Sequence, residues 1–155
     1  MKSLYIAAWR LLYFLSLPVA RQKIRRSRRA YILITHGDSA LMIRDLFSDQ
    51  RWKLPGGGAH AGEAYEQTAL RETGEELGLE LEPGNLKLLT HGLWRTHDYN
   101  CPYQIFLVRL KKRPALQLRQ GEIFDAKWMS LADLAGQKLA PEIAQALAAA
   151  NLRAR

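Results

Sequence analysis

The chain has a single cysteine and lacks any long apolar run. One cysteine, Cys101, cannot form an internal disulfide, which excludes the small disulfide-stapled domains and leads us to expect a reducing, cytoplasmic compartment. No apolar stretch approaches the ~20 residues that a membrane-spanning helix needs. Residues 11–20 resemble the apolar part of a secretory signal, but Arg10 precedes them and a basic cluster follows at once, so we do not expect export.

Acidic residues are absent from positions 1–29. That segment holds eight of the 23 basic residues, and the other 15 are balanced by the 15 acidic residues of positions 30–155, so the N-terminus carries the whole net charge of +8. We therefore divide the chain into an N-terminal apolar helix with a basic segment, residues 1–29, and one globular domain, residues 30–155. A hydrophobic content of 48% suits a single folded domain of this size.

The N-terminal segment has several interpretations. Residues 3–16 read as a helix that is apolar nearly all round and is closed by Pro18. It either packs on the domain or against a second subunit in a homodimer, which we favour, or lies on an anionic membrane surface beside the basic run 21–29. That run has no interleaved aromatic residues, so no specific nucleic-acid partner is predicted.

The rest of the chain alternates strand and helix patterns, which indicates a layered α/β or α+β domain. The turn-forming residues 36–39 join the first two strands as a hairpin. Strands are predicted over 30–35, 41–45, 52–54, 86–94, 103–110 and 123–129, and helices over 64–77, 131–135 and 141–152.

Three glutamates gather on one side of the helix predicted over 64–77. At about 100° per residue, Glu72, Glu75 and Glu76 share a sector of about 100° near the C-terminal end of the helix. Like charges one turn apart repel, and the helix dipole disfavours anions at this end. Because clustered carboxylate oxygens suit a hard cation, the pattern indicates a site for Mg²⁺ or Mn²⁺ rather than a solvated acidic face.

Other residues of this segment are predicted to pack, pair with or end the helix. Leu70, Thr73 and Leu77 form an apolar stripe for packing. Arg71 stands one turn before Glu75 and can pair with it. Gly78 is placed to end the helix in a left-handed conformation.

Residues 57–79 read G-x5-E-x7-R-E-T-x-E-E-x-G-L, which resembles the signature of the Nudix family of pyrophosphohydrolases, G-x5-E-x7-R-E-U-x-E-E-x-G-U with U a bulky apolar residue. The one departure is Thr73 at a U position, where a β-branched side chain packs much like Val. The resemblance implies a Nudix fold, with a mixed β-sheet sandwiched between α-helices.

The resemblance also implies roles for individual residues. Arg71 would position a ligand, and Glu63 would support the metal shell. The implied metal ligands are the Gly56 carbonyl and the carboxylates of Glu72, Glu75 and Glu76.

Glu122 is the best candidate for a further ligand or catalytic base. It lies in a Gly-Glu pair before the strand that contains Trp128 and Met129, which resembles a common pattern downstream of the Nudix motif. The proton of the attacking water would pass either to a motif glutamate such as Glu75 or to Glu122. The sequence leaves this choice open.

Several residues are candidates for substrate contacts. Aromatic side chains could stack on a base, and basic ones could reach phosphates. The aromatic candidates are Trp52, Trp94 and Tyr99, the basic ones Arg44, Arg95 and the stretch 111–113, and His97 beside Asp98 is the histidine of interest. Trp94 and Thr96 occupy the positions where the family's markers for ADP-ribose and diadenosine polyphosphates would stand, so neither substrate is indicated.

The resemblance thus predicts a Mg²⁺-dependent pyrophosphohydrolase acting on a nucleoside diphosphate derivative or a nucleoside triphosphate. The alternative is a Nudix-fold module that binds a nucleotide or a protein without cleaving it. A hydrolase guided to membranes or nucleic acid by residues 1–29 is a third hypothesis.

Overall fold

The structure is a computed structural model that describes residues 28–46, 51–95, 100–134, 137 and 139–152. The predicted helix 3–16 and most of the basic run 21–29 lie outside these residues, as do Thr96, His97, Asp98 and Tyr99. The division of the chain at residue 29 therefore stays a prediction. No helix in the described ranges is long and apolar enough to cross a membrane.

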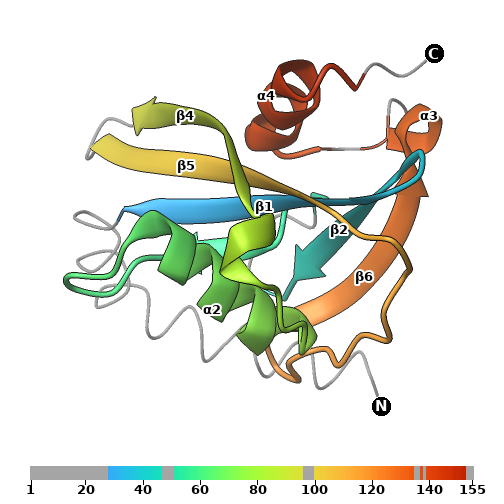
Figure 1. The fold of residues 1–155 in the computed structure, drawn as a ribbon, viewed down its shortest axis with the longest axis horizontal. Coiled ribbons are helices and arrows are strands. Elements are labelled where there is room, and N and C mark those ends of the chain that lie inside the picture. Colours follow the sequence, from blue (N-terminus) through green and yellow to red (C-terminus); the bar gives the residue numbers. More distant parts are fainter. Residues whose placement is uncertain (1–27, 47–50, 96–99, 135–136, 138, 153–155) are drawn as a thin grey trace.

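One mixed six-stranded sheet forms the centre of the domain, and helices cover both of its faces (Figure 1). The strand order is β4-β5-β1-β2-β6, and β3 pairs with the start of β1. Among the strands of the described residues, only β1 and β5 pair in parallel. The strands are β1 (Arg29–His36), β2 (Ser39–Asp45), β3 (Gly56–Gly58), β4 (Lys87–Arg95), β5 (Asn100–Arg109) and β6 (Ile123–Ser130).

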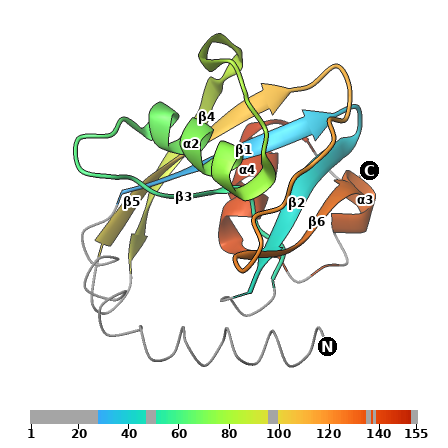
Figure 2. The same ribbon diagram turned by 90° about the horizontal axis from the view of Figure 1, so that it is seen from below.

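Two helices pack on opposite faces of this sheet (Figures 1 and 2). They are α2 (Tyr65–Leu77) and α4 (Pro141–Ala149), and two shorter helices, η1 (Pro83–Asn85) and α3 (Leu131–Leu134), complete the fold. The predicted sheet between helices is confirmed.

Strand β1 explains why the core has two halves. Side chains alternate between the faces of a strand, and residues 30–35 are all buried, so β1 feeds both layers. Tyr31 and Leu33 join the cluster that contains Ile143 of α4, whereas Ile32 and Ile34 join the cluster that contains Leu77 of α2.

The strand predicted over 52–54 is wrong in position. Trp52 and Lys53 form only isolated bridges, and the strand lies on the glycines that follow. A Cβ on Gly56, which has a φ of 136°, would come within 2.2 Å of the Ala30 carbonyl oxygen. Only glycine therefore allows β3 to lie this close to β1.

Helix ends differ slightly from the prediction. α2 ends at Gly78 in the left-handed conformation with φ 65°, as predicted. α4 ends at Ala149 rather than at 152, because Asn151 adopts a left-handed φ of 54°. The 3-10 helix η1 was not predicted.

Candidate metal and substrate site

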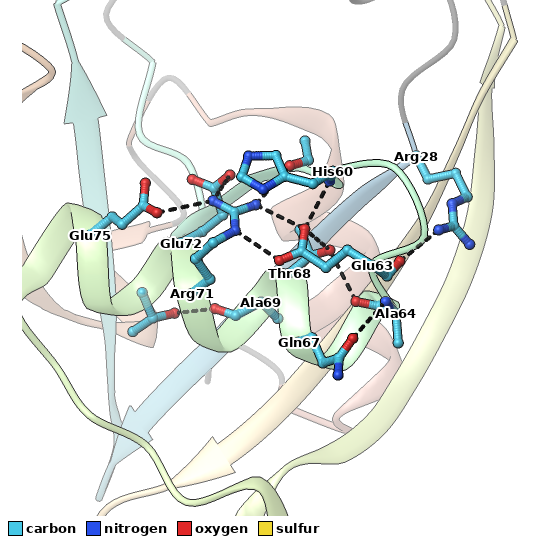
Figure 3. Close-up of polar contacts among 12 residues, drawn as sticks. Arg28, His60, Glu63, Ala64, Gln67, Thr68, Ala69, Arg71, Glu72 and Glu75 are labelled. Atoms are coloured by element: carbon cyan, nitrogen blue, oxygen red, sulfur yellow. Dashed lines mark hydrogen bonds and ion pairs between the residues drawn. The ribbon is translucent and has the colours of Figure 1, made fainter.

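Arg71 is the centre of a hydrogen-bonded network on α2 (Figure 3). Its Nε donates to Oε1 of Glu63 at 2.8 Å, and its Nη2 donates to the Gly58 carbonyl at 2.9 Å. Its Nη1 donates to Oε1 of Glu72 at 3.0 Å and to Oε1 of Glu75 at 3.3 Å. The predicted pair with Glu75 exists, but it is the longest of these contacts, and Glu63 is the main partner.

Glu63 is fully engaged within the chain. Besides Arg71, it accepts the His60 N–H at 2.8 Å and the Thr68 hydroxyl at 3.0 Å, both on Oε2. These donors, Arg71 first, lower the pKa of Glu63 to about 2. Glu63 therefore fixes the loop before α2 to the helix and keeps Arg71 in place.

Glu76 is a buried carboxylate at the end of the same helix. Its residue is only 3% exposed, and its Oε2 accepts the Gly56 N–H at 2.8 Å. The pKa of Glu76 is raised to about 8, first by burial and then by the neighbouring Glu72 and Glu122, while Lys53 and the Gly56 N–H act in the opposite direction. A solvated acidic face would not bury a carboxylate, so that interpretation fails for Glu76.

Glu72 lies against the backbone of β3. A Cβ added to Gly57 would come within 2.6 Å of the Glu72 carboxyl, so a larger residue at position 57 would displace this carboxyl from its place beside β3. Burial raises the pKa of Glu72, Arg71 opposes the shift, and Glu75 and Glu122 add to it. Glu72, Glu75, Glu76 and Glu122 are thus close enough to influence one another.

The loop before β6 reaches the site because it caps α2. The last carbonyls of a helix lack partners within the helix. Here the Leu77 carbonyl accepts the Gln117 N–H at 2.8 Å, and the Glu76 carbonyl accepts the Arg119 N–H at 3.0 Å. This pairing brings Glu122, 46 residues after Glu76 in the printed sequence, to the C-terminal end of α2.

Arg119 joins this loop to the helix through its side chain as well. Its Nη1 lies 2.9 Å from Oε2 of Glu75 and 3.1 Å from Oε2 of Glu122. Arg119 was not among the residues predicted for the site. Its position three residues before Glu122 was the available signal, but a basic residue in a loop is usually solvated.

The donor set fits a hard divalent cation. It consists only of oxygens, and it includes a buried carboxylate whose charge is incompletely compensated, which a cation would stabilise. As they stand, these carboxylates face Arg71, Arg119 and the Gly56 N–H, and no three acidic, histidine or cysteine side chains among the described residues form a ready cluster for an ion. A bound cation would therefore compete with the arginines for Glu72 and Glu75.

A cavity of about 510 Å³ opens on the other side of Gly56, and we call it the α4 cavity. It lies between the first turn of α4 and the ends of β1 and β4. Its lining residues are Arg29, Tyr31, Asp45, Arg51, Lys53, Gly56, Leu93, Trp94, Arg95, Ala140, Pro141 and Glu142.

Two of the predicted substrate contacts, Trp94 and Arg95, line the α4 cavity. Trp52 does not, because it is 4% exposed and belongs to the core. Arg44 covers its ring with the guanidinium 4.0 Å from the ring centroid. The prediction that Trp52 offers a stacking face is therefore wrong.

The basic stretch 111–113 also lies elsewhere. Arg113 donates to Ser39 Oγ at 2.8 Å and packs over Trp128, beside the β1–β2 hairpin. The basic residues that do line the cavity, besides Arg95, are Arg29, Arg51 and Lys53, which sequence reasoning did not single out. They come together only through the pairing of β1, β2 and the segment before β3.

Comparisons with known proteins agree with this geometry. The family model described as the NUDIX domain matches residues 24–150. An uncharacterised protein of Schizosaccharomyces pombe is 33% identical over 115 residues, which cover 66% of this chain and 35% of the yeast protein. The chain thus spans about a third of the length of that curated relative.

Two solved structures share the fold. The MutT NUDIX hydrolase of Burkholderia pseudomallei superposes with a TM-score of 0.70 at 23% identity, over 79% of this chain and 95% of that one. A C. elegans Ap4A hydrolase superposes with a TM-score of 0.68 at 20% identity, over 81% and 95% of the two chains. With the family model matching most of its length and the mixed sheet between helices in place, this chain belongs to the Nudix family.

Proposed function

We propose that the chain is a Mg²⁺- or Mn²⁺-dependent pyrophosphohydrolase that cleaves a phosphoanhydride bond in a nucleoside diphosphate derivative or a nucleoside triphosphate. The observation that carries the proposal is the buried Glu76 carboxylate, surrounded by further carboxylates at the end of α2. Both similar solved structures are hydrolases by name, one of them named for Ap4A, which supports a nucleotide substrate.

In this proposal the metal is held by the Gly56 carbonyl and by the carboxylates of Glu72, Glu75, Glu76 and Glu122. A bound divalent ion would neutralise phosphate charge and lower the pKa of the attacking water. Arg71 acts as a positioning residue, because its contacts with Glu63 and Gly58 fix the guanidinium that orients Glu72 and Glu75.

We propose Glu122 as the group that accepts the proton when the water oxygen bonds to phosphorus and the anhydride P–O bond breaks. Its side chain is 37% exposed, so water can reach it, whereas Glu76 is buried. Arg119 holds it beside Glu75. A motif glutamate, Glu75 foremost, is the alternative acceptor.

All three helix glutamates are present, which weighs against a module that only binds. The single cysteine supports the further proposal of a reducing, cytoplasmic compartment. Homodimer formation or membrane contact through residues 1–29 stays a prediction.

A panel of nucleoside triphosphates and nucleoside diphosphate derivatives, incubated with the full chain and Mg²⁺, tests the function through released phosphate or pyrophosphate. We expect turnover of at least one compound, and its loss in EDTA with recovery on adding Mg²⁺. Turnover that persists in EDTA would contradict the metal requirement. Binding without release of any product would favour the non-catalytic module.

A further inference from the structure

Glu142 is a buried carboxylate without a complete set of partners. It lies in the first turn of α4, its residue is 3% exposed, and it lines the α4 cavity. Its Oε2 is buried and accepts no hydrogen bond from any described residue. Because buried polar atoms in native proteins are nearly always paired, this oxygen needs an explanation.

The helix dipole accounts for an acid at this position but not for the missing donor. An anion is favoured at the N-terminus of the nine-residue helix α4. Burial nevertheless raises the pKa of Glu142, although its own backbone N–H, Lys53, Arg51 and Arg29 act in the opposite direction. The ionised carboxylate is thus incompletely compensated by the chain, and a ligand with N–H donors would supply what is missing.

The cavity walls suit the remaining parts of a nucleotide. Trp94 lines the cavity, with its ring centroid 5.7 Å from that of Tyr31, and the Arg29 guanidinium lies 5.9 Å from the Trp94 centroid. An aromatic face and a guanidinium plane are the groups on which bases stack. Gly56 lines the cavity on one side and donates its N–H to Glu76 on the other, so phosphates would extend past Gly56 toward the carboxylates.

We infer that Glu142 binds the edge of a nucleobase that offers two adjacent N–H donors, and that this chain therefore prefers guanine nucleotides to adenine nucleotides. Two N–H donors from the ligand would stabilise the ionised form of Glu142, which only accepts hydrogen bonds. Guanine presents its N1–H beside its 2-amino group, whereas adenine presents the acceptor N1 beside its 6-amino group. The inference rests on the proposed function, because it takes a nucleotide as the substrate.

Titration calorimetry of the full wild-type chain with GMP, IMP and AMP tests the preference for guanine. These monophosphates contain no anhydride bond, so binding is measured separately from turnover. We expect GMP to bind about ten- to hundredfold more tightly than AMP, the range for one bidentate contact to a base. IMP, which lacks the 2-amino group, should fall between them. Equal affinities, or no measurable binding of any of the three, would overturn the inference.

The variant Glu142→Gln sharpens the test, because an amide offers one acceptor and one donor in the same shape. We expect the preference for GMP over AMP to fall at least about tenfold, with AMP binding unchanged or tighter. The control Glu80→Gln changes an exposed glutamate after α2 and should keep the wild-type ratio. An unchanged ratio in Glu142→Gln would overturn the inference.

The two proposals can fail separately. A preference for GMP without hydrolysis of any anhydride keeps the inference and removes the proposed enzyme. Hydrolysis with equal binding of GMP and AMP keeps the enzyme and removes the inference.

Discussion

The α2 side of Gly56 and the α4 cavity differ in how many hydrogen-bond donors the chain supplies to their carboxylates. Glu63 receives donors from Arg71, His60 and Thr68, and its pKa falls to about 2. Glu142 keeps one oxygen without a donor, and its pKa rises. The comparison indicates that the loop before α2 is complete within the chain, whereas the α4 cavity is completed by what it binds. Between them, Glu76 is buried like Glu142, and its Oε2 accepts the Gly56 N–H.

The largest expected effect is the loss of activity when Glu76, the buried carboxylate at the end of α2, is replaced. Glu76→Gln should lower kcat about a thousandfold or more, because a divalent ion contributes several kcal/mol and loses a charged ligand. The melting temperature without metal should stay the same or rise, because the amide can still accept the Gly56 N–H and carries no buried charge. Steady-state kinetics measures kcat, and calorimetric melting measures the melting temperature. A large loss of stability would instead make Glu76 a structural residue.

Glu122→Gln should lower kcat about a hundredfold with a modest change in KM, the size expected for a lost proton acceptor. Wild-type rates in this variant would assign the proton to Glu75 or another helix glutamate. Glu82→Gln, an exposed acid outside the site, serves as the matched control.

Arg71→Ala should lower the free energy of unfolding by about 2–3 kcal/mol, because Glu63 and Glu72 lose charge-assisted hydrogen bonds. Arg119→Ala should change it by less than about 1 kcal/mol, because the Arg119 side chain is 49% exposed. Urea unfolding of the two variants tests whether the network is preassembled around Arg71. Equal losses would show that burial does not distinguish the two arginines.

The smallest expected effect is a pH dependence. The folded pKa of Glu76, about 8, lies above its ordinary value of 4.5, so in this window the folded state holds a proton that the unfolded state has lost. Glu76 therefore stabilises the fold least at high pH, and between pH 7 and pH 8 it should lower the free energy of unfolding by about 1 kcal/mol or less.

Glu63 does not contribute to the change in the free energy of unfolding between pH 7 and pH 8. Its folded pKa is depressed to about 2, so its stabilisation is present above about 4.5 and is lost only as the pH falls toward 2. Urea unfolding at pH 7 and pH 8 in EDTA, compared between wild type and Glu76→Gln, isolates Glu76. A pH 7 to pH 8 change that is identical in the two proteins would contradict the raised pKa.

The carboxylates of α2 could be predicted from the sequence because these residues lie close together in the chain, on a single helix. Glu72, Glu75 and Glu76 fall on one helix whose register and Gly78 end follow from the sequence. The role of Glu63 as the main partner of Arg71 was less accessible, because it depends on how the loop before α2 turns back. Arg119 was missed because its contact depends on the loop that caps the carbonyls of α2.

The α4 cavity could not be predicted in this way. Arg29, Lys53, Trp94 and Glu142 are far apart in the sequence, and they meet through sheet pairing and the docking of α4. Burial also decides which aromatic residue is accessible: Trp52 packs in the core, whereas Trp94 lines the cavity. The sequence does not predict this difference, because Trp52 lies between Arg51 and Lys53 and yet is the buried one.

Because Gly56 lies between the acidic end of α2 and the α4 cavity, the cavity can be engineered separately from the carboxylates. The N–H of Gly56 bonds to Glu76 and its other side borders the α4 cavity, so the hydrogen-bonded link between them is made by the backbone. Residues of the cavity wall can then be exchanged to accept another base while the acidic end of α2 keeps its geometry. A library restricted to positions 93–95 and 142 would explore substrate choice without disturbing hydrolysis, whereas any substitution at position 56 would collide with Ala30 and disturb both sides together.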